Sequence, residues 1–199
     1  MRVEVVEASI TFGDHSVFTD LSATFFSGRV TALAGPSGSG KSSLLAAVAA
    51  HQPLAGGRIE LHRSTGEVTP PTPGLAVWVP QGSNALARRT VLDNVLIGPL
   101  SAGRSMKAAQ DLARDALYQV GLIDREREQA RRLSGGELQR VALARAIASE
   151  KPLILADEPS ANLDASNPAR VADLLSRLVT TATVVVATHD PLLIAAADH

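Results

Sequence analysis

Residues 35–42 read GPSGSGKS and carry the clearest chemical signal in the sequence. They fit the pattern G-x-x-x-x-G-K-[ST] and lie between an apolar run and a helix-forming run, which is the context this pattern needs. The glycines let the backbone wrap a phosphate with its N–H groups pointing inward. Lys41 is expected to reach the β- and γ-phosphates, and the Ser42 hydroxyl to bind Mg²⁺. The alternative is a plain glycine-rich turn, which the flanking pattern disfavours.

Two adjacent acids, Asp157 and Glu158, follow a buried apolar run in the stretch LILADEP. We expect Asp157 to hold Mg²⁺ directly or through water, as strand-end aspartates do in phosphate-loop enzymes. Glu158 points to the opposite side if the pleat of the strand continues, and there it can accept a proton from an attacking water. A solvated turn is the ordinary reading of an Asp-Glu pair, but the apolar run before it argues against that here.

Gln81 and His189 each follow another apolar run. Taken alone, either residue has an ordinary structural explanation. Beside a phosphate loop, His189 is expected to sense the γ-phosphate rather than bind a metal, and Gln81 to bind Mg²⁺ or the lytic water. These two residues therefore join the candidate site.

The stretch SGGE, residues 134–137, predicts the start of a helix and contains two glycines in its first turn. Ser134 and Glu137 have the spacing of a capping box. Each glycine costs about 1 kcal/mol of helix propensity relative to alanine. Bare glycines expose N–H groups and the positive end of the helix dipole, which together attract an anion. Because this helix lies away from the predicted strand ends, we expect it to cap the nucleotide of a second copy, in a dimer enclosing two ATP molecules.

Four apolar runs are expected to position these groups as parallel strands buried on both faces. They cover residues 29–35, 74–80, 152–158 and 183–190. In open α/β sheets, ligands bind at the carboxyl ends of the strands. The polar residues and the glycine loop at these four ends therefore predict one shared site.

The other segments follow different patterns. Residues 3–33 alternate loosely, which predicts an antiparallel β layer. Residues 56–74 are rich in Gly, Pro and Thr and indicate a surface hairpin and loop. Residues 84–149 have a helical pattern and form an insertion between the second and third buried strands. The fold class is therefore α/β.

Composition narrows the classes of function. The chain of 199 residues has a net charge of −1, so no general field attracts nucleic acid or an anionic membrane, and we expect no nucleic-acid partner. It contains no cysteine, which excludes a disulfide or a thiolate metal site. No run has the length of a membrane span or the core of a signal peptide, so we expect a cytoplasmic protein.

Together these motifs resemble those of the ATP-binding cassette (ABC) ATPases. The phosphate loop, Gln81, LSGGE, LILADEP, SANLD and His189 stand in the order and spacing of that family over essentially the whole chain. The resemblance implies a RecA-like phosphate-loop core with an N-terminal antiparallel β layer and an inserted helical subdomain. Within one domain, 1–199, the core and β layer would take 1–83 and 150–199, and the helical subdomain 84–149.

The resemblance also implies roles for single residues. Glu158 would be the general base, and His189 would contact the γ-phosphate. Asp164 in SANLD would couple the two sites across the dimer. Ser134 and Gly136 would bind the γ-phosphate held by the partner.

The expected protein is an ATPase subunit that drives a separate transmembrane permease from the inner face of the membrane, with the loop around Gln81 touching the permease. The stretch ADEPSANLD is similar to cassettes of lipoprotein-release, macrolide-export and cell-division-type permeases, so export is expected. Importers of polar amino acids are an alternative. A soluble cassette acting on DNA or ribosomes is disfavoured by the near-neutral charge, and a non-hydrolysing regulator by Glu158 and His189.

Three features depart from the family pattern. Phe12 stands where a tyrosine usually stacks on adenine, and it keeps the π-face. Ser43 stands where threonine is common. The chain stops at His199, where family members continue; we expect this to affect the stability of the sheet edge more than the chemistry of the site.

The residues expected to contact ATP are Phe12, Gly35, Pro36, Ser37, Gly38, Ser39, Gly40, Lys41, Ser42, Ser43, Ser134, Gly135, Gly136, Glu137 and Asp164. Those expected to bind Mg²⁺ are Ser42, Gln81 and Asp157, and those expected to act in catalysis are Glu158, His189, Lys41 and Gln81.

Overall fold

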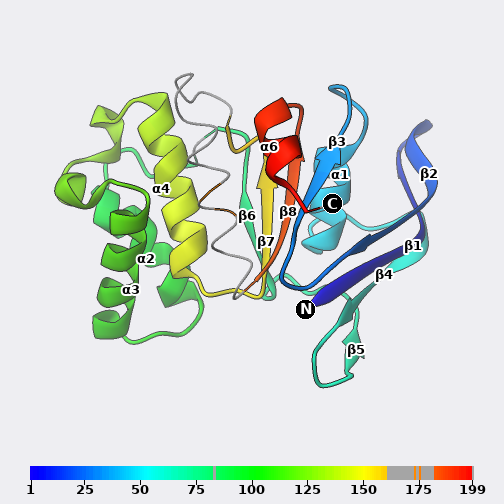
Figure 1. Ribbon diagram of the computed structural model, residues 1–199, viewed down its shortest axis with the longest axis horizontal. Helices are drawn as coiled ribbons and strands as arrows, with labels where there is room; N and C mark the ends of the chain where they lie inside the picture. Colours follow the sequence, from blue (N-terminus) through cyan, green and yellow to red (C-terminus); the bar gives the residue numbers. More distant parts are fainter. Residues whose placement is uncertain (83, 161–172, 174, 176–181, 199) are drawn as a thin grey trace.

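The structure, a computed structural model, describes residues 1–82, 84–160, 173, 175 and 182–198 (Figure 1). Its described strands form two sheets. The antiparallel sheet runs in the order β2 (His15–Phe25), β1 (Arg2–Phe12), β4 (Gly56–His62) and β5 (Val68–Thr69). The parallel sheet runs in the order β3 (Val30–Ala34), β8 (Thr183–Thr188), β7 (Leu153–Asp157) and β6 (Ala76–Val79). These four parallel strands are the four apolar runs of the sequence.

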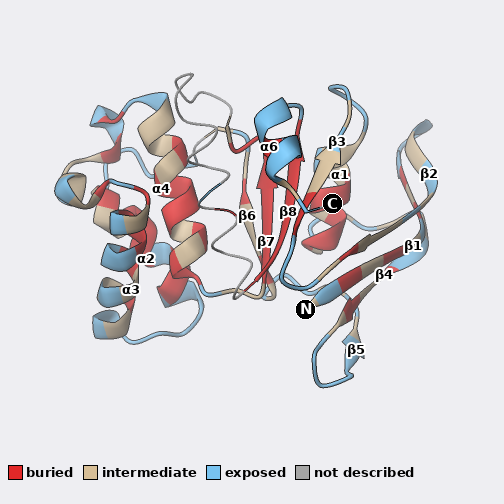
Figure 2. Cartoon of the chain, in the orientation of Figure 1, coloured by how far each residue is buried: buried red, intermediate tan, exposed pale blue. Residues whose placement is uncertain are grey.

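The parallel sheet is the middle layer of the molecule. Every residue of β7 and β8 is buried, as Figure 2 shows. Successive side chains of a strand point to opposite faces, and the core divides accordingly. Ile154 and Val184 pack into the cluster that faces the helices α2, α3 and α4, whereas Leu155 and Val185 pack into the cluster beneath the antiparallel sheet. The continuous apolar runs are explained by this burial on both sides.

The antiparallel sheet packs alternate residues of its strands against the apolar cluster that contains Leu155 and Val185. Val3 and Val5 of β1 and Ile59 and Leu61 of β4 are buried there. The hairpin predicted in residues 56–74 is present as β4 and β5, but β4 does not lie only at the surface. β4 pairs along β1 and contributes to the core, because its residues alternate between buried and exposed in the way a half-buried strand requires.

Helices cover both faces of the parallel sheet. The described α-helices are α1 (Lys41–Val48), α2 (Val91–Ser101), α3 (Met106–Gln119), α4 (Gly135–Ala148) and α6 (Pro191–Ala196), and the short 3₁₀ turns are η1 (Ile123–Arg125) and η2 (Ala130–Arg132). α2, α3 and α4 lie together at one side of the molecule, while α1 lies between the two sheets (Figure 1). Within the described residues, no helix combines the length and the apolar character needed to cross a membrane.

Candidate functional site

A pocket of about 600 Å³ lies where the parallel strands end. The loop after β3, the residue pair at the end of β7, and the residues after β6 and β8 all reach it. The predicted convergence of the strand ends is thus present in the structure. The pocket is lined by His15, Val17, Pro36, Ser37, Gly38, Ser39, Gly40, Lys41, Ser42, Ser43, Gln81, Asp157, Glu158 and His189.

Two residues of the loop from Gly35 to Gly40 have a backbone conformation that favours glycine. Gly38 and Gly40 have φ values of +80° and +88°, a left-handed conformation that costs other residues energy. A Cβ on Gly40 would also come within 2.7 Å of Val17. α1 begins at Lys41, and no side chain in the described structure caps its first turn. The N–H groups of this turn, together with the positive end of the helix dipole, are therefore suited to bind an anion such as phosphate.

The Lys41 ammonium is held at the mouth of this loop. Its Nζ donates to the carbonyl oxygens of Gly35, at 2.8 Å, and Pro36, at 2.9 Å. A lysine ammonium has three N–H donors. The third can donate to an anionic ligand, and the two carbonyls of the loop orient the positive charge of Lys41.

Asp157 and Glu158 are both buried, with 7% and 8% of their surface exposed, and both line the pocket. The prediction that Glu158 points to the opposite side from Asp157 assumed that the pleat continues. The assumption was wrong, because β7 ends at Asp157 and Glu158 has a φ of +46°. The Glu158 N–H still donates to the Ala187 carbonyl of β8, at 2.8 Å. This turn in the backbone brings both carboxylates to one pocket.

Glu158 is held by two neighbours from the end of β8. Its Oε1 lies 2.8 Å from His189 Nδ1, and its Oε2 accepts a hydrogen bond of 3.2 Å from the Thr188 hydroxyl. The His189 side chain is 77% exposed, so its other nitrogen, Nε2, can meet a ligand. A buried carboxylate oriented by a histidine is suited to position a water and accept its proton.

The helix predicted at Ser134 is present, with Ser134 as N-cap and a complete capping box. Glu137 Oε2 accepts the backbone N–H of Ser134 at 2.8 Å, and Glu137 Oε1 lies 3.1 Å from an Arg125 nitrogen. The Ser134 N–H, aided by the Ser134 hydroxyl and the charge of Arg125, holds the pKa of the Glu137 carboxyl below its usual value. Residues 134–137 are absent from the lining of the pocket, so this helix end lies apart from it.

Because the pKa of Glu137 is lowered, its contribution to stability is expected to depend on pH. Glu137→Ala should lower the free energy of unfolding by about 1 kcal/mol at neutral pH, since it removes half of the capping box. A carboxyl whose pKa is lowered by folding stabilises the protein above its unfolded-state pKa, and this contribution is lost as the pH falls through the folded-state pKa. The difference between variant and wild type should therefore shrink below about pH 4.5, in urea unfolding followed by circular dichroism. Glu67→Ala, on the exposed β4–β5 turn, is the control; a pH-independent difference at Glu137 would contradict the assignment.

Not every expected ligand lies in the pocket. Phe12 is 52% exposed and pairs with His15 across the β1–β2 turn, and it is His15, with Val17, that lines the pocket. Gly35 lies just outside the lining, where its carbonyl holds Lys41. Asp164 lies outside the described residues. The sequence analysis did not identify His15, Val17 or Thr188 as parts of the site. The position of His15 in the turn after Phe12 and the position of Thr188 directly before His189 could have indicated the first and the last of them.

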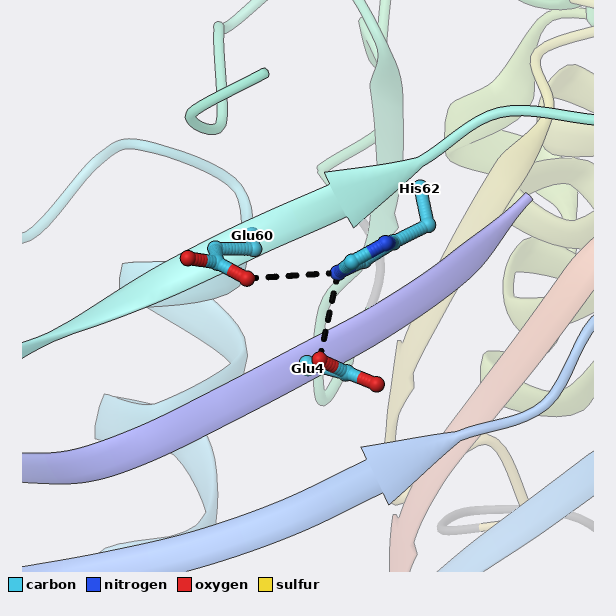
Figure 3. Close-up of side chains that lie close together, drawn as sticks. All are labelled: Glu4, Glu60 and His62. Carbon is cyan, nitrogen blue, oxygen red and sulfur yellow. Dashed lines mark ion pairs between the residues drawn. The ribbon is translucent and has the colours of Figure 1, made fainter. Parts of the chain in front are cut away.

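A second cluster of ligand-type side chains lies on the outer face of the antiparallel sheet (Figure 3). His62 Nε2 lies 3.2 Å from Glu4 Oε2 and 3.3 Å from Glu60 Oε2. Each glutamate also pairs with an arginine through Oε1, Glu4 with Arg2 at 2.8 Å and Glu60 with Arg58 at 2.7 Å. The Arg58 contact, above all, holds the pKa of Glu60 below its usual value. The arginines already balance both carboxylates, so this cluster is an ion-pair network across two strands.

Comparisons with known proteins show the family of this chain and its fold. A family model described as "ABC transporter" matches residues 18–161. The arginine transport ATP-binding protein ArtM of Bacillus subtilis is 37% identical over 94% of this chain and 81% of its own length. The aliphatic sulfonates import ATP-binding protein SsuB 2 of Streptomyces avermitilis is 42% identical over 84% of this chain and 62% of its own. A solved dimeric structure of MJ0796, a bacterial ABC transporter cassette, superposes with a TM-score of 0.85 at 26% identity, over 98% of this chain and 91% of that one.

Proposed function

We propose that this chain, which belongs to the ABC transporter family, is the ATPase subunit of an importer and drives a separate transmembrane permease as a dimer that encloses two ATP molecules. One observation carries the proposal. The phosphate loop, two buried carboxylates, Gln81 and His189 line one pocket, while the capped glycines at 134–136 lie outside it. The chain holds a nucleotide site and, apart from it, a second anion site that suits the nucleotide of another copy.

The residues of the pocket fit ATP with Mg²⁺. Ser42, Gln81 and Asp157 offer a hydroxyl, an amide and a carboxylate oxygen, which are the hard ligands that Mg²⁺ prefers. Bound there, Mg²⁺ would neutralise charge on the phosphates. Lys41 and the first turn of α1 would bind the phosphate oxygens.

Hydrolysis requires a water placed in line with the γ-phosphate. Glu158 is the residue that would orient this water and accept its proton, with Thr188 and His189 fixing its carboxylate. His189 would meet the γ-phosphate through Nε2. The second helix end, at Ser134, would supply N–H groups to the same phosphate from the partner copy.

The proposal of an importer replaces the export direction expected from ADEPSANLD. Its support is in the relatives, since SsuB 2 is named for import of aliphatic sulfonates and ArtM for transport of arginine. Deletion of the gene tests the direction. An importer predicts lost uptake of a labelled amino acid or sulfonate into cells, with recovery on complementation by the wild type but not by Glu158→Gln. Normal uptake of all such solutes, with slower efflux of a preloaded one, would favour export instead.

The dimer is tested at Ser134. Ser134→Arg should leave ATP binding by the monomer intact but prevent ATP-driven dimerisation, because a long side chain fills the space that the partner's phosphate would occupy. The measurement is gel filtration with light scattering, with Glu158→Gln as the background so that ATP persists. Ser105→Arg is the control, since Ser105 is the exposed N-cap of α3, where its side chain accepts the Ala108 N–H, and the loss of such a cap costs about 1 kcal/mol. A dimer that forms equally with Ser134→Arg would remove this helix end from the interface.

A further inference from the structure

The Ser134 hydroxyl is already bound within its own chain. It donates to Glu137 Oε2 at 3.0 Å and accepts the Glu137 N–H at 3.3 Å. A serine hydroxyl has a single hydrogen to donate. A phosphate that is to receive this hydrogen must therefore take it from the carboxylate of Glu137.

The same carboxylate places a negative charge at the start of α4. The Ser134 N–H donates to Glu137 Oε2 at 2.8 Å, and this contact, above all, holds the pKa of Glu137 below its usual value. Glu137 is therefore ionised at neutral pH. Its side chain is only partly exposed, so water does not fully screen the charge. The charge stabilises the helix start of the free chain, but it repels a second anion that approaches the N–H groups of Gly135 and Gly136.

Arg125 binds this carboxylate through its other oxygen. Arg125 Nη1 lies 3.1 Å from Glu137 Oε1, which leaves Oε2 to Ser134. The guanidinium is itself held by Glu128, from Nε at 2.6 Å and from Nη2 at 2.9 Å. One guanidinium thus faces two carboxylates, and it balances the charge of Glu137 only in part. Among the described residues Arg140 also lowers the pKa of Glu137, but less than Arg125 does.

The orientation of Arg125 does not depend on α4. Arg125 is the last residue of η1, and Glu128 follows it in the segment before the helix. The two contacts with Glu128 therefore fix the guanidinium from outside α4. A carboxylate that lost its contact with Ser134 would still have this partner at Oε1.

We propose that Glu137 and Arg125 set the affinity of this helix end for the partner's nucleotide, Glu137 as an internal competitor for the Ser134 hydroxyl and Arg125 as the positioning residue that limits its charge. When the partner's γ-phosphate arrives, Ser134 donates to the phosphate instead, and Arg125 keeps the released carboxylate. The inference rests on the proposed function for the role of Ser134. It adds the residues that determine how readily the dimer forms.

The dissociation constant of the dimer at saturating ATP and Mg²⁺ tests the inference, by analytical ultracentrifugation with Glu158→Gln as the background so that ATP persists. Glu137→Gln keeps the acceptor of the capping box but removes the charge, and it should tighten the dimer about tenfold. Arg125→Met leaves the carboxylate unbalanced and should weaken the dimer about tenfold, whereas Arg125→Lys keeps the charge and should lose less. Each dimer contains two of these helix ends, so an effect of about threefold at one end is squared.

A double-mutant cycle identifies the charge of Glu137 as the cause. With Glu137→Gln in place, Arg125→Met should change the dimer constant by less than about twofold, because the charge to be balanced is gone. Equal losses with and without Glu137→Gln would overturn the role of Arg125, and a Glu137→Gln dimer no tighter than the background would overturn the competition. Arg104→Met is the control for the loss of an ion-paired arginine. Arg104 pairs with Glu150, just beyond the other end of α4, at 2.7 Å, and its replacement should leave the dimer constant unchanged.

The free chain gives a readout that does not depend on a dimer. In Arg125→Met without nucleotide, the titration of the Glu137 carboxyl, followed by carbon NMR, should move to higher pH, because the guanidinium lowers the pKa of this carboxyl. An unmoved titration would overturn the inference even in an active dimeric ATPase. A moved titration without an ATP-driven dimer in any variant would overturn the proposed function and, with it, the role of this pair in dimer formation.

Discussion

Glu158→Gln is expected to lower the rate of ATP hydrolysis by about 10²–10⁴-fold while ATP binding remains. The amide has the shape of the carboxylate and can still accept from Thr188 and meet His189 Nδ1, so the pocket should keep its geometry. It cannot accept a proton from water. Binding without turnover should therefore leave ATP in place and make the proposed dimer persist. Phosphate release gives the rate, and gel filtration with and without ATP gives the dimer.

Glu150→Gln is a matched control for this change. Glu150 has a similar backbone, with a φ of +50° against +46° for Glu158, and its carboxylate also contacts a side-chain nitrogen, that of Arg104, at 2.7 Å. It follows α4 and does not line the pocket. Its replacement should leave the hydrolysis rate within about twofold of wild type, as surface changes of this kind usually do. A Glu158→Gln variant that hydrolyses ATP at the wild-type rate would remove Glu158 as the base.

The parts of the structure that could be predicted from sequence are those set by local patterns. β7 and β8 are continuous apolar runs because both of their faces are buried, and such runs show directly in the sequence. The start of α4 was equally visible, since Ser134 and Glu137 have the spacing that a capping box requires. Because parallel strands end at one edge, knowing the strands was enough to bring Lys41 and Glu158 to the same pocket.

The misplaced features depend on backbone conformation and on distant contacts. The direction of Glu158 was wrong because a positive φ at a glutamate has no signature in residue type. The contact of Gln139 with Pro80 joins residues 59 positions apart, and no periodicity indicates it. His15 lines the pocket beside the β1–β2 turn and its cross-strand partner Phe12 does not, a difference that residue type does not indicate. Sequence patterns thus located the reacting groups better than the residues that orient them.

Lys41→Ala is expected to weaken ATP binding by about 10- to 100-fold, because a hydrogen bond between an ammonium and a phosphate is worth about 1.5–3 kcal/mol. The structure supports this with a specific arrangement. Two of the three N–H donors of Lys41 are taken by the carbonyls of Gly35 and Pro36, so the charge stays at the loop before any nucleotide arrives. The variant loses the charge and also leaves two loop carbonyls without their donor, which loosens the cradle around the phosphates. Titration calorimetry with ATP and Mg²⁺ measures the Kd directly.

Lys151→Ala separates these two contributions. Lys151 Nζ also donates to a backbone carbonyl, that of Ala76 at 3.1 Å, but it lies at the opposite end of the parallel sheet from the pocket. The two variants should lose similar amounts of stability in thermal unfolding, since each gives up a lysine-to-carbonyl contact, while only Lys41→Ala should lose affinity. If both variants bound ATP as the wild type does, the loop at residues 35–42 would not be the phosphate site. Any effect of Glu158 or His189 on the rate of ATP hydrolysis would then need another explanation.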